Sequence, residues 1–281
     1  CNDTFILEAN KAVAQPLSDL PLRIIGLSWG YDIADAPAEG RDLAWLARLA
    51  GLIVDSRENE RQVIAAGVAP ESITFMPWGV DLNRWHFSGP WIDAFLLGVP
   101  PHAPLVLSLR AHESIYRVED IIRAFAALER DPDTHEDFPD PYLIVGHSGS
   151  LTPHLRQLAL DLDISRRVRW IGSVPEDELG PLFGRASCYV TASSVDGTSV
   201  TLLQAMACGT PVIASAIAGN LGWIADGVTG FTYPVGDIPA LTGVMTHVLA
   251  NKSLEVTQRA RSLVEEEADW PTNLARLSHA L

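Results

Sequence analysis

One segment of the chain, residues 192–236, constrains the fold more than any other. It begins with a polar, glycine-bearing loop (ASSVDGTS), continues with an apolar stretch (VTLLQAMA), and reaches a β-rich run (VIAS) after Gly209 and Pro211. Apolar side chains in the middle stretch recur at helical spacing, and Ser199 or Thr198 can cap a helix that starts there. Gly209 ends that helix, and the run after it favours a strand. The segment therefore predicts a loop, a helix and a strand in succession.

The start of this predicted helix suits an anionic ligand. Backbone N–H groups in a first helical turn lack partners within the helix, and the helix dipole places partial positive charge there. Asp196 lies in the loop beside this point, and Gln204 lies further along the helix. An acid and an amide in those places can hold hydroxyl groups. The pattern favours a ligand with a diphosphate and hydroxyls, and the alternative is an ordinary crossover loop that only caps a helix.

The charge and the cysteine content of the chain limit what it can bind and where it can function. A net charge of −15 argues against non-specific nucleic-acid binding, so a phosphate-bearing ligand needs a local basic pocket. Cys188 and Cys208 lie in apolar runs and are predicted to be buried free thiols, as in a reducing cytosol. No apolar stretch approaches the ~18 residues of a membrane span, and no signal peptide is visible. We therefore expect a cytoplasmic protein without a nucleic-acid partner.

Strands and helices alternate along the chain, which predicts an α/β fold with parallel sheets. The length of 281 residues favours about two domains, and a Gly-, Pro- and Trp-bearing stretch at 77–104 is predicted to join them. The predicted strands cover 22–27, 51–55, 73–76, 105–109, 142–145, 168–171, 188–191 and 212–214. The predicted helices cover 42–49, 58–66, 118–128, 155–162, 176–183, 238–250, 253–268 and 270–281, besides the one that starts at 199 or 200.

The chain resembles the retaining nucleotide-sugar glycosyltransferases of family 4. Members of that family carry Glu-x7-Glu followed by Ala-Met-Ala-x-Gly-x-Pro-Val; here Asp196 and Gln204 occupy the two Glu positions and AMACGTPVIAS follows. The resemblance continues in SITFMPWGVDLNRWHF, LVLSLRAHESIYRVEDIIRAFAAL, VRWIGSVPEDELGPLFGRASCYVTAS and LSWGYD. It implies a GT-B fold, an α/β architecture with two Rossmann-like parallel-sheet domains.

The resemblance also implies a division of the chain. Residues 1–88 would form a partial acceptor-side domain, residues 89–268 the nucleotide-sugar (donor) domain, and residues 269–281 a C-terminal helix. The N-terminal domain is expected to be incomplete, because the family's first strand and glycine-rich loop would precede Cys1. A peripheral membrane contact is expected only through that preceding part.

The activity implied is metal-independent, retaining transfer of a sugar from a nucleotide-diphosphate sugar to a glycan, lipid or small-molecule acceptor. The donor is a substrate, and neither a cofactor nor a metal site is expected. Two alternatives stay open. One is a non-catalytic or degenerate nucleotide-sugar-binding protein, which the changes at Tyr116, Gln204 and Trp29 favour. The other is a GT-B nucleotide-sugar epimerase, which would need more acids and histidines around the sugar.

Arg110 and Asp196 are the residues expected to carry the chemistry. Arg110 follows the predicted strand 105–109, at the edge where α/β proteins bind ligands, and matches the family's basic residue on the diphosphate. A guanidinium suits phosphate oxygens. Asp196 matches the acid that contacts the sugar, although an Asx-turn is the alternative. Tyr116 replaces the family's second basic residue, and the following Arg117 is either its substitute or a surface residue.

The other predicted residues form the donor and acceptor surfaces. Gln204 would hold the ribose, with a solvent-facing helix residue as the alternative. On the acceptor side, Trp29 stands where the family has its catalytic His; it cannot act as a base but can stack on a sugar, and Asp32 lies near it in sequence. The remaining donor-side positions are Gly197, Thr198, Ser199 and Val200 for sugar and phosphate, Gly172 and Ser173 under the base, and Gly146 and His147 in the nucleotide pocket.

Overall fold

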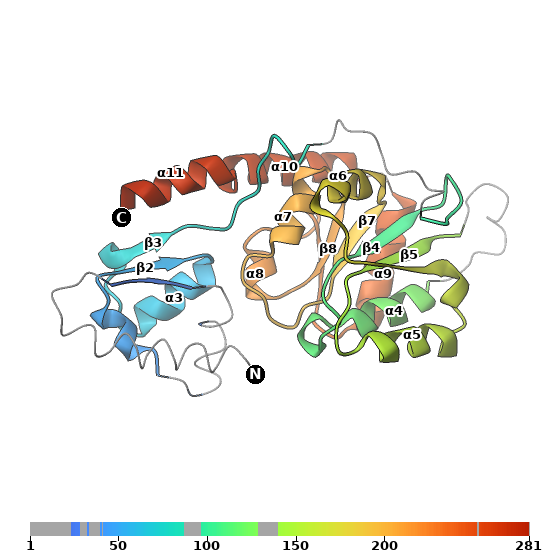
Figure 1. The fold of residues 1–281 in the computed structure, drawn as a ribbon, viewed down its shortest axis with the longest axis horizontal. Helices are drawn as coiled ribbons and strands as arrows, with labels where there is room; N and C mark the ends of the chain where they lie inside the picture. The colour runs from blue at the N-terminus through green and yellow to red at the C-terminus, as the bar shows by residue number, and fades with distance from the viewer. Residues whose placement is uncertain are drawn as a thin grey trace.

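The computed structural model describes residues 24–28, 33, 40, 42–86, 97–128, 140–251 and 253–280. These residues form two separate parallel sheets, one of three strands and one of six, each with helices packed on it (Figure 1). The α/β class and the parallel sheets predicted from the sequence are confirmed.

The smaller, N-terminal sheet has the strand order β1-β2-β3, with β1 at Ile25–Leu27, β2 at Gly51–Val54 and β3 at Ile73–Phe75. Helix α3 (Arg57–Ala65) follows β2, and its N-cap Ser56 accepts a hydrogen bond from the Asn59 N–H. The short 3-10 helices η1 (Ala44–Arg48) and η2 (Pro70–Ser72) complete this part. The helix predicted at 42–49 is η1, a shorter helix of the 3-10 type.

The six-stranded sheet has the strand order β6-β5-β4-β7-β8-β9. Its strands are nearly continuous apolar runs because helices cover both faces. The chain enters at the centre with β4, moves outward to one edge, and then crosses back to β7, so the direction of winding reverses between β4 and β7. The strands are β4 (Leu105–Ser108), β5 (Tyr142–Gly146), β6 (Val168–Gly172), β7 (Cys188–Thr191), β8 (Val212–Ser215) and β9 (Phe231–Tyr233).

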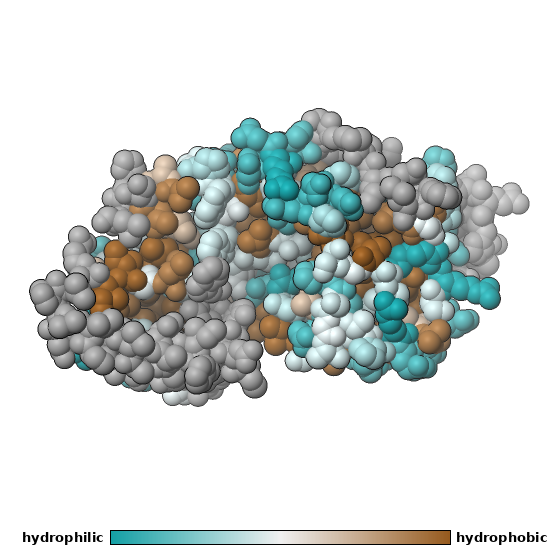
Figure 2. All heavy atoms as spheres, in the orientation of Figure 1, coloured by the Kyte–Doolittle hydropathy of each residue, from teal (hydrophilic) through white to brown (hydrophobic). Residues whose placement is uncertain are grey.

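Two hydrophobic clusters fill the two faces of this sheet. One cluster joins it to α4 (Val118–Ala126), α5 (Thr152–Asp161) and α9 (Ile238–Ala250). The other joins it to α6 (Glu176–Arg185), α7 (Val200–Ala207) and α10 (Leu254–Glu267). Shorter helices are η3 (Ser114–Tyr116), η4 (Ser165–Arg167) and α8 (Ala218–Leu221). On the face that Figure 2 shows, hydrophobic residues reach the surface at the N-terminal sheet, and hydrophilic and hydrophobic residues are mixed over the six-stranded sheet.

The last helix, α11 (Trp270–Ala280), runs back over the N-terminal sheet (Figure 1). The Val80 N–H donates to the carbonyl of Ala268 (2.8 Å), and the Trp270 N–H donates to the carbonyl of Val80 (3.1 Å). Trp78 stacks on Trp270 with 6.2 Å between ring centres. Gly79 permits this approach, because a Cβ there would lie 2.8 Å from the Ala268 oxygen. The segment after β3 is thus packed against the end of the chain.

Candidate functional site

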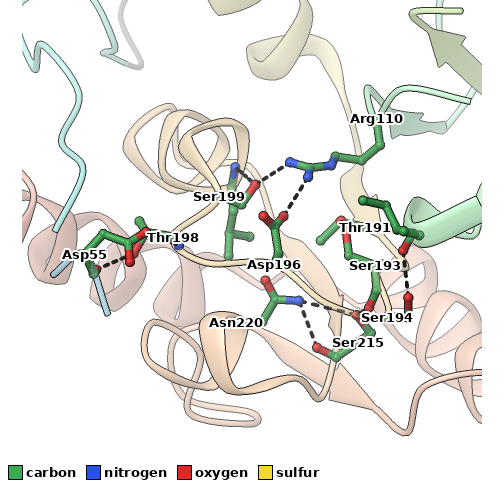
Figure 3. A network of polar contacts seen from close by, with 12 residues as sticks. Asp55, Arg110, Thr191, Ser193, Ser194, Asp196, Thr198, Ser199, Ser215 and Asn220 are labelled. Atoms are coloured by element: carbon green, nitrogen blue, oxygen red, sulfur yellow. Dashed lines mark hydrogen bonds and ion pairs between the residues drawn. The ribbon is translucent and has the colours of Figure 1, made fainter. Parts of the chain in front are cut away.

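The candidate site lies where the winding of the six-stranded sheet reverses, at the carboxyl ends of β4 and β7. Open α/β sheets bind ligands at such a point. Arg110 follows β4, and the loop 192–199 follows β7. The Arg110 guanidinium donates through Nη2 to Asp196 Oδ2 (2.6 Å) and through Nη1 to Ser199 Oγ (3.0 Å), as Figure 3 shows. The fold therefore brings together three of the residues predicted from the sequence.

The ion pair in this site is largely shielded from solvent. Both side chains are 12% exposed. Burial alone lowers the pKa of Arg110, but Asp196, Tyr189 and Tyr116 outweigh it and the pKa is raised, so the guanidinium stays charged. Burial raises the pKa of Asp196, and Arg110 offsets part of that rise. The Tyr116 ring lies 4.1 Å from the guanidinium carbon. A fixed positive charge thus stands at the reversal point of an acidic chain.

Helix α7 starts directly at this charge. Ser199 caps the helix as predicted, because its Oγ accepts the Leu202 N–H (3.4 Å). The same hydroxyl accepts the bond from Arg110, so one side chain fixes both the helix start and the guanidinium. Gln204 lies four residues after Val200, so it lies on the same face of α7 as Val200, and its side chain is partly buried.

The loop 192–199 is held by several contacts to its own domain (Figure 3). Ser215 Oγ donates to the Ser193 carbonyl (2.6 Å), and Asn220 Nδ2 donates to the Ser215 carbonyl (2.9 Å). The Ser194 N–H donates to the carbonyl of Ile115 (2.8 Å). These bonds fix the loop against β8, α8 and η3.

Thr198 contacts the N-terminal sheet. Its Oγ1 donates to the backbone carbonyl of Asp55 (2.8 Å), and its N–H donates to Asp55 Oδ2 (3.3 Å). Asp55 follows β2 and was not singled out in the sequence. The predicted strand 51–55 includes Asp55 as its last residue, whereas β2 ends at Val54, so the signal that identified Arg110 was hidden by the predicted bounds. The backbone N–H of Thr198, predicted to meet the donor, is therefore engaged by a protein carboxylate.

Four other predicted donor residues lie at the carboxyl ends of the neighbouring strands β5 and β6. The His147 N–H donates to the Gly172 carbonyl (2.6 Å), and both residues have positive φ, +66° and +68°. Gly146 has no room for a side chain, because a Cβ would lie 2.5 Å from Leu109 Cδ2. The side chains of His147 and Ser173 are exposed. Buried His112 supports this edge, with Nε2 3.1 Å from the Gly146 oxygen, and burial lowers its pKa.

Arg117 is turned toward its own helix. It has a left-handed φ of 47°, and its Nε donates to Asp120 Oδ2 (2.6 Å). It lines a cavity of about 310 Å³ with His112 and Leu155, and Arg110 does not line that cavity. The two predicted acceptor-side residues, Trp29 and Asp32, lie outside the described residues.

A larger cavity of about 740 Å³ opens beside Thr198. It lies between the N-terminal and six-stranded sheets, since residues from α3 and β3 line it together with residues from α8 and α10. Its lining includes Asp55, Arg57, Phe75, Gly219, Trp223 and Leu263. The place where the two sheets meet thus offers room for a ligand directly next to the loop 192–199.

Within the described ranges, no group of three or more His, Cys, Asp or Glu residues is placed to hold a metal ion. In the same part of the chain, no helix has both the length and the apolar character needed to span a bilayer.

Comparison with known proteins identifies the family. Residues 93–266 match the family model described as glycosyl transferases group 1, a match over more than half of the chain. The chain belongs to this family. The match to the group 1 model includes all of the six-stranded sheet, with Arg110 and the loop 192–199.

Individual members of the group 1 family and related structures extend the comparison. The chain is 30% identical over 164 residues to D-inositol 3-phosphate glycosyltransferase of Frankia alni, and 28% identical over 163 residues to lipopolysaccharide core biosynthesis glycosyltransferase LpsE of Rhizobium meliloti. These alignments cover 57% and 58% of the chain, which spans 40% and 44% of the two relatives.

A solved structure of HepE from Anabaena, in complex with UDP and glucose, is similar with a TM-score of 0.82 at 18% identity. The match covers 97% of this chain and 75% of HepE. It confirms the GT-B type fold with two Rossmann-like parallel-sheet domains.

Proposed function

We propose that the chain is a retaining, metal-independent glycosyltransferase of the family 4 type that uses a nucleotide-diphosphate sugar. The main observation behind this proposal is that Arg110 donates hydrogen bonds to Asp196 and Ser199 at the point where the winding of the six-stranded sheet reverses. Two names support it: the Frankia and Rhizobium relatives are both called glycosyltransferases, and the HepE structure contains UDP and glucose. The acceptor class is a glycan, a lipid or a small molecule.

The site has groups suited to each part of such a donor. Bond breaking at the anomeric carbon leaves negative charge on the diphosphate, and stabilising that charge is a main source of catalysis. The Arg110 guanidinium and the start of α7 supply positive potential there. Asp196 accepts hydrogen bonds from sugar hydroxyls, because Arg110 fixes only part of its carboxylate. The backbone at Gly172 and His147 supports the base.

We also propose the domain assignment predicted from the sequence, in which residues 1–88 belong to a partial acceptor-side domain, residues 89–268 to the donor domain, and residues 269–281 to a C-terminal helix. We infer a cytoplasmic location from Cys188 and Cys208, which are buried free thiols whose pKa values burial raises to about 12.

The proposal is tested by supplying donors and acceptors to the purified chain. We expect one of UDP, GDP and ADP to bind in calorimetry, and the matching nucleotide sugar to give a product with the donor's anomeric configuration by NMR. Binding must persist when EDTA is present. An inverted product, or loss of binding in EDTA, would contradict the proposed mechanism.

A second candidate function is a non-catalytic nucleotide-sugar-binding protein. The contact between Arg117 and Asp120 favours it, because Arg117 is thereby directed to its own helix rather than to Arg110. Donor binding without sugar transfer to any of a panel of acceptors would support this candidate. An epimerase would instead convert the nucleotide sugar without an acceptor.

Replacing Gln204 by Ala tests whether its amide holds the ribose. We expect the wild type to prefer ribo- over 2′-deoxyribonucleotide diphosphates, and Gln204→Ala to lose that preference. A neutral hydrogen bond of about 0.5–1.5 kcal/mol corresponds to a roughly 2- to 13-fold change in affinity. Gln157→Ala on α5 is the matched control. The Gln157 amide lies on the surface, where it donates a hydrogen bond to Asp161 on the same helix. If both variants discriminate as the wild type does, Gln204 does not hold the ribose.

A further inference from the structure

A buried group of polar residues joins the two sheets at the edge of the candidate site. Thr198 is 7% exposed and Asp55 is 2% exposed, so their contact excludes water. Two hydrogen bonds join them, from Thr198 Oγ1 to the Asp55 carbonyl and from the Thr198 N–H to Asp55 Oδ2. A buried contact of this kind fixes the relative positions of the two residues, because leaving a buried polar group without a hydrogen-bond partner costs free energy. An exposed ion pair does not have this effect.

The N-terminal sheet holds Asp55 firmly in place for this contact. Asn59 on α3 is fully buried and donates through Nδ2 to Asp55 Oδ1 (3.0 Å) and to Ser28 Oγ (3.1 Å). Ser28 follows β1, Asp55 follows β2, and Asn59 lies in the first turn of α3. Three elements of the N-terminal sheet therefore orient one carboxylate toward Thr198.

The loop 192–199 is confined from the opposite side by α8. A Cβ at Gly219 would lie 2.2 Å from the Gly197 oxygen and 2.4 Å from the Asp196 oxygen, so the helix backbone packs directly on the loop. Trp223 Nε1 reaches Thr198 Oγ1 at 3.4 Å. The loop is therefore held between α8 of its own domain and Asp55 of the N-terminal sheet.

We propose that Asp55 is a positioning residue of the candidate site: by holding Thr198 across the junction, it sets the loop that presents Asp196 and starts α7. The consequence for donor binding rests on the function proposed above. Asp196 is two residues before Thr198 and Ser199 is the next residue, so a shift at Thr198 moves both partners of Arg110. The N-terminal sheet thereby contributes to a binding site formed by the other domain.

Three variants separate this role from a general effect on folding. Asp55→Asn keeps the shape of the side chain but replaces one acceptor oxygen by a donor, so either the Thr198 N–H or Asn59 loses its partner. Thr198→Val removes the hydroxyl that donates to Asp55, and Thr198→Ser keeps it. Asp81→Asn, at an exposed acid in the segment after β3, is the matched control.

Hydrogen exchange and calorimetry then give the readouts. We expect Asp55→Asn and Thr198→Val each to speed amide exchange in the loop 192–199 and to weaken nucleotide-diphosphate binding about three- to tenfold. The double variant should lose less affinity than the sum of the two single losses, because each change removes one of the two hydrogen bonds that hold the same contact. Thr198→Ser should weaken binding less than Thr198→Val does, and Asp81→Asn should stay within about twofold of wild type.

The possible results distinguish the two proposals. Unchanged loop exchange in Asp55→Asn and Thr198→Val, additive losses in the double variant, or a Thr198→Ser variant as weak as Thr198→Val would each overturn the positioning role. If the wild type binds none of UDP, GDP and ADP while loop exchange still responds to Asp55→Asn, the proposed function fails and the positioning of the loop stands.

Discussion

Replacing Arg110 by Ala is expected to weaken binding of the nucleotide diphosphate by roughly 10- to 150-fold. The physical reason is the loss of a charge-assisted hydrogen bond, which contributes about 1.5–3 kcal/mol. The variant also leaves Asp196, 12% exposed in the wild type, without its cation, so that a carboxylate remains near the incoming phosphate. Titration calorimetry with the preferred nucleotide diphosphate measures the change.

A matched control for Arg110 is available in the same domain. Arg123 on α4 pairs with Glu119 on the surface, at 40% exposure, and Arg123→Ala should bind the nucleotide as wild type does. The affinity of Arg110→Lys for the nucleotide should lie between those of Arg110→Ala and Arg123→Ala, because Lys keeps the positive charge but not the planar guanidinium group. Equal affinities of wild type and a folded Arg110→Ala variant would remove Arg110 from the site.

The second large effect is expected for Gly219→Ala. A methyl group there would lie 2.2 Å from the Gly197 oxygen, so either α8 or the loop 192–199 must move. Overpacking of this kind costs about 1–3 kcal/mol of stability, and we expect weaker nucleotide binding with it because the loop carries Asp196. Denaturant unfolding and calorimetry on the same sample report the two effects.

Gly243→Ala on α9 is the control for this substitution. A Cβ there meets nothing within 4 Å, and Ala is favoured over Gly in a helix by up to about 1 kcal/mol. It should therefore leave stability unchanged or raise it, with normal nucleotide binding. If Gly219→Ala behaves like Gly243→Ala in both measurements, the close packing of α8 on the loop has no energetic consequence.

The sequence predicted the six-stranded sheet well because most of its strands are continuous apolar runs, and apolar residues recur at helical spacing in the longer helices. The strand at 188–191 and the helix at 238–250 were predicted with their observed bounds, and Ser199, one of the two predicted caps, is the N-cap of α7. The strand β9 and the four-residue helix α8 were not predicted, because neither is long enough to show a period. The expected strand at 22–27 is β1, whose Leu27 is 41% exposed rather than buried.

The candidate site was predictable where one local rule sufficed. Arg110 was found because it follows a buried strand, and its contact with Asp196 follows from the reversal between β4 and β7. Asp55 was missed because its partner Thr198 lies 143 residues away and in another domain. The direction of Arg117 depends on a left-handed backbone at that residue, which the sequence of a non-glycine residue does not reveal.

The return of the chain to the segment after β3 has a consequence for biosynthesis. Asn273 Nδ2 donates to the carbonyl of Pro77, a residue 196 positions earlier. At a translation rate of ~5–20 residues per second, the segment with Trp78 and Val80 waits about 10–40 s for the residues that cover it. The six-stranded sheet is complete at β9, before those residues emerge from the ribosome, so the N-terminal sheet is expected to acquire its final packing last. Trp78 is therefore expected to lack its stacking partner Trp270 for most of the time that the chain is being synthesised.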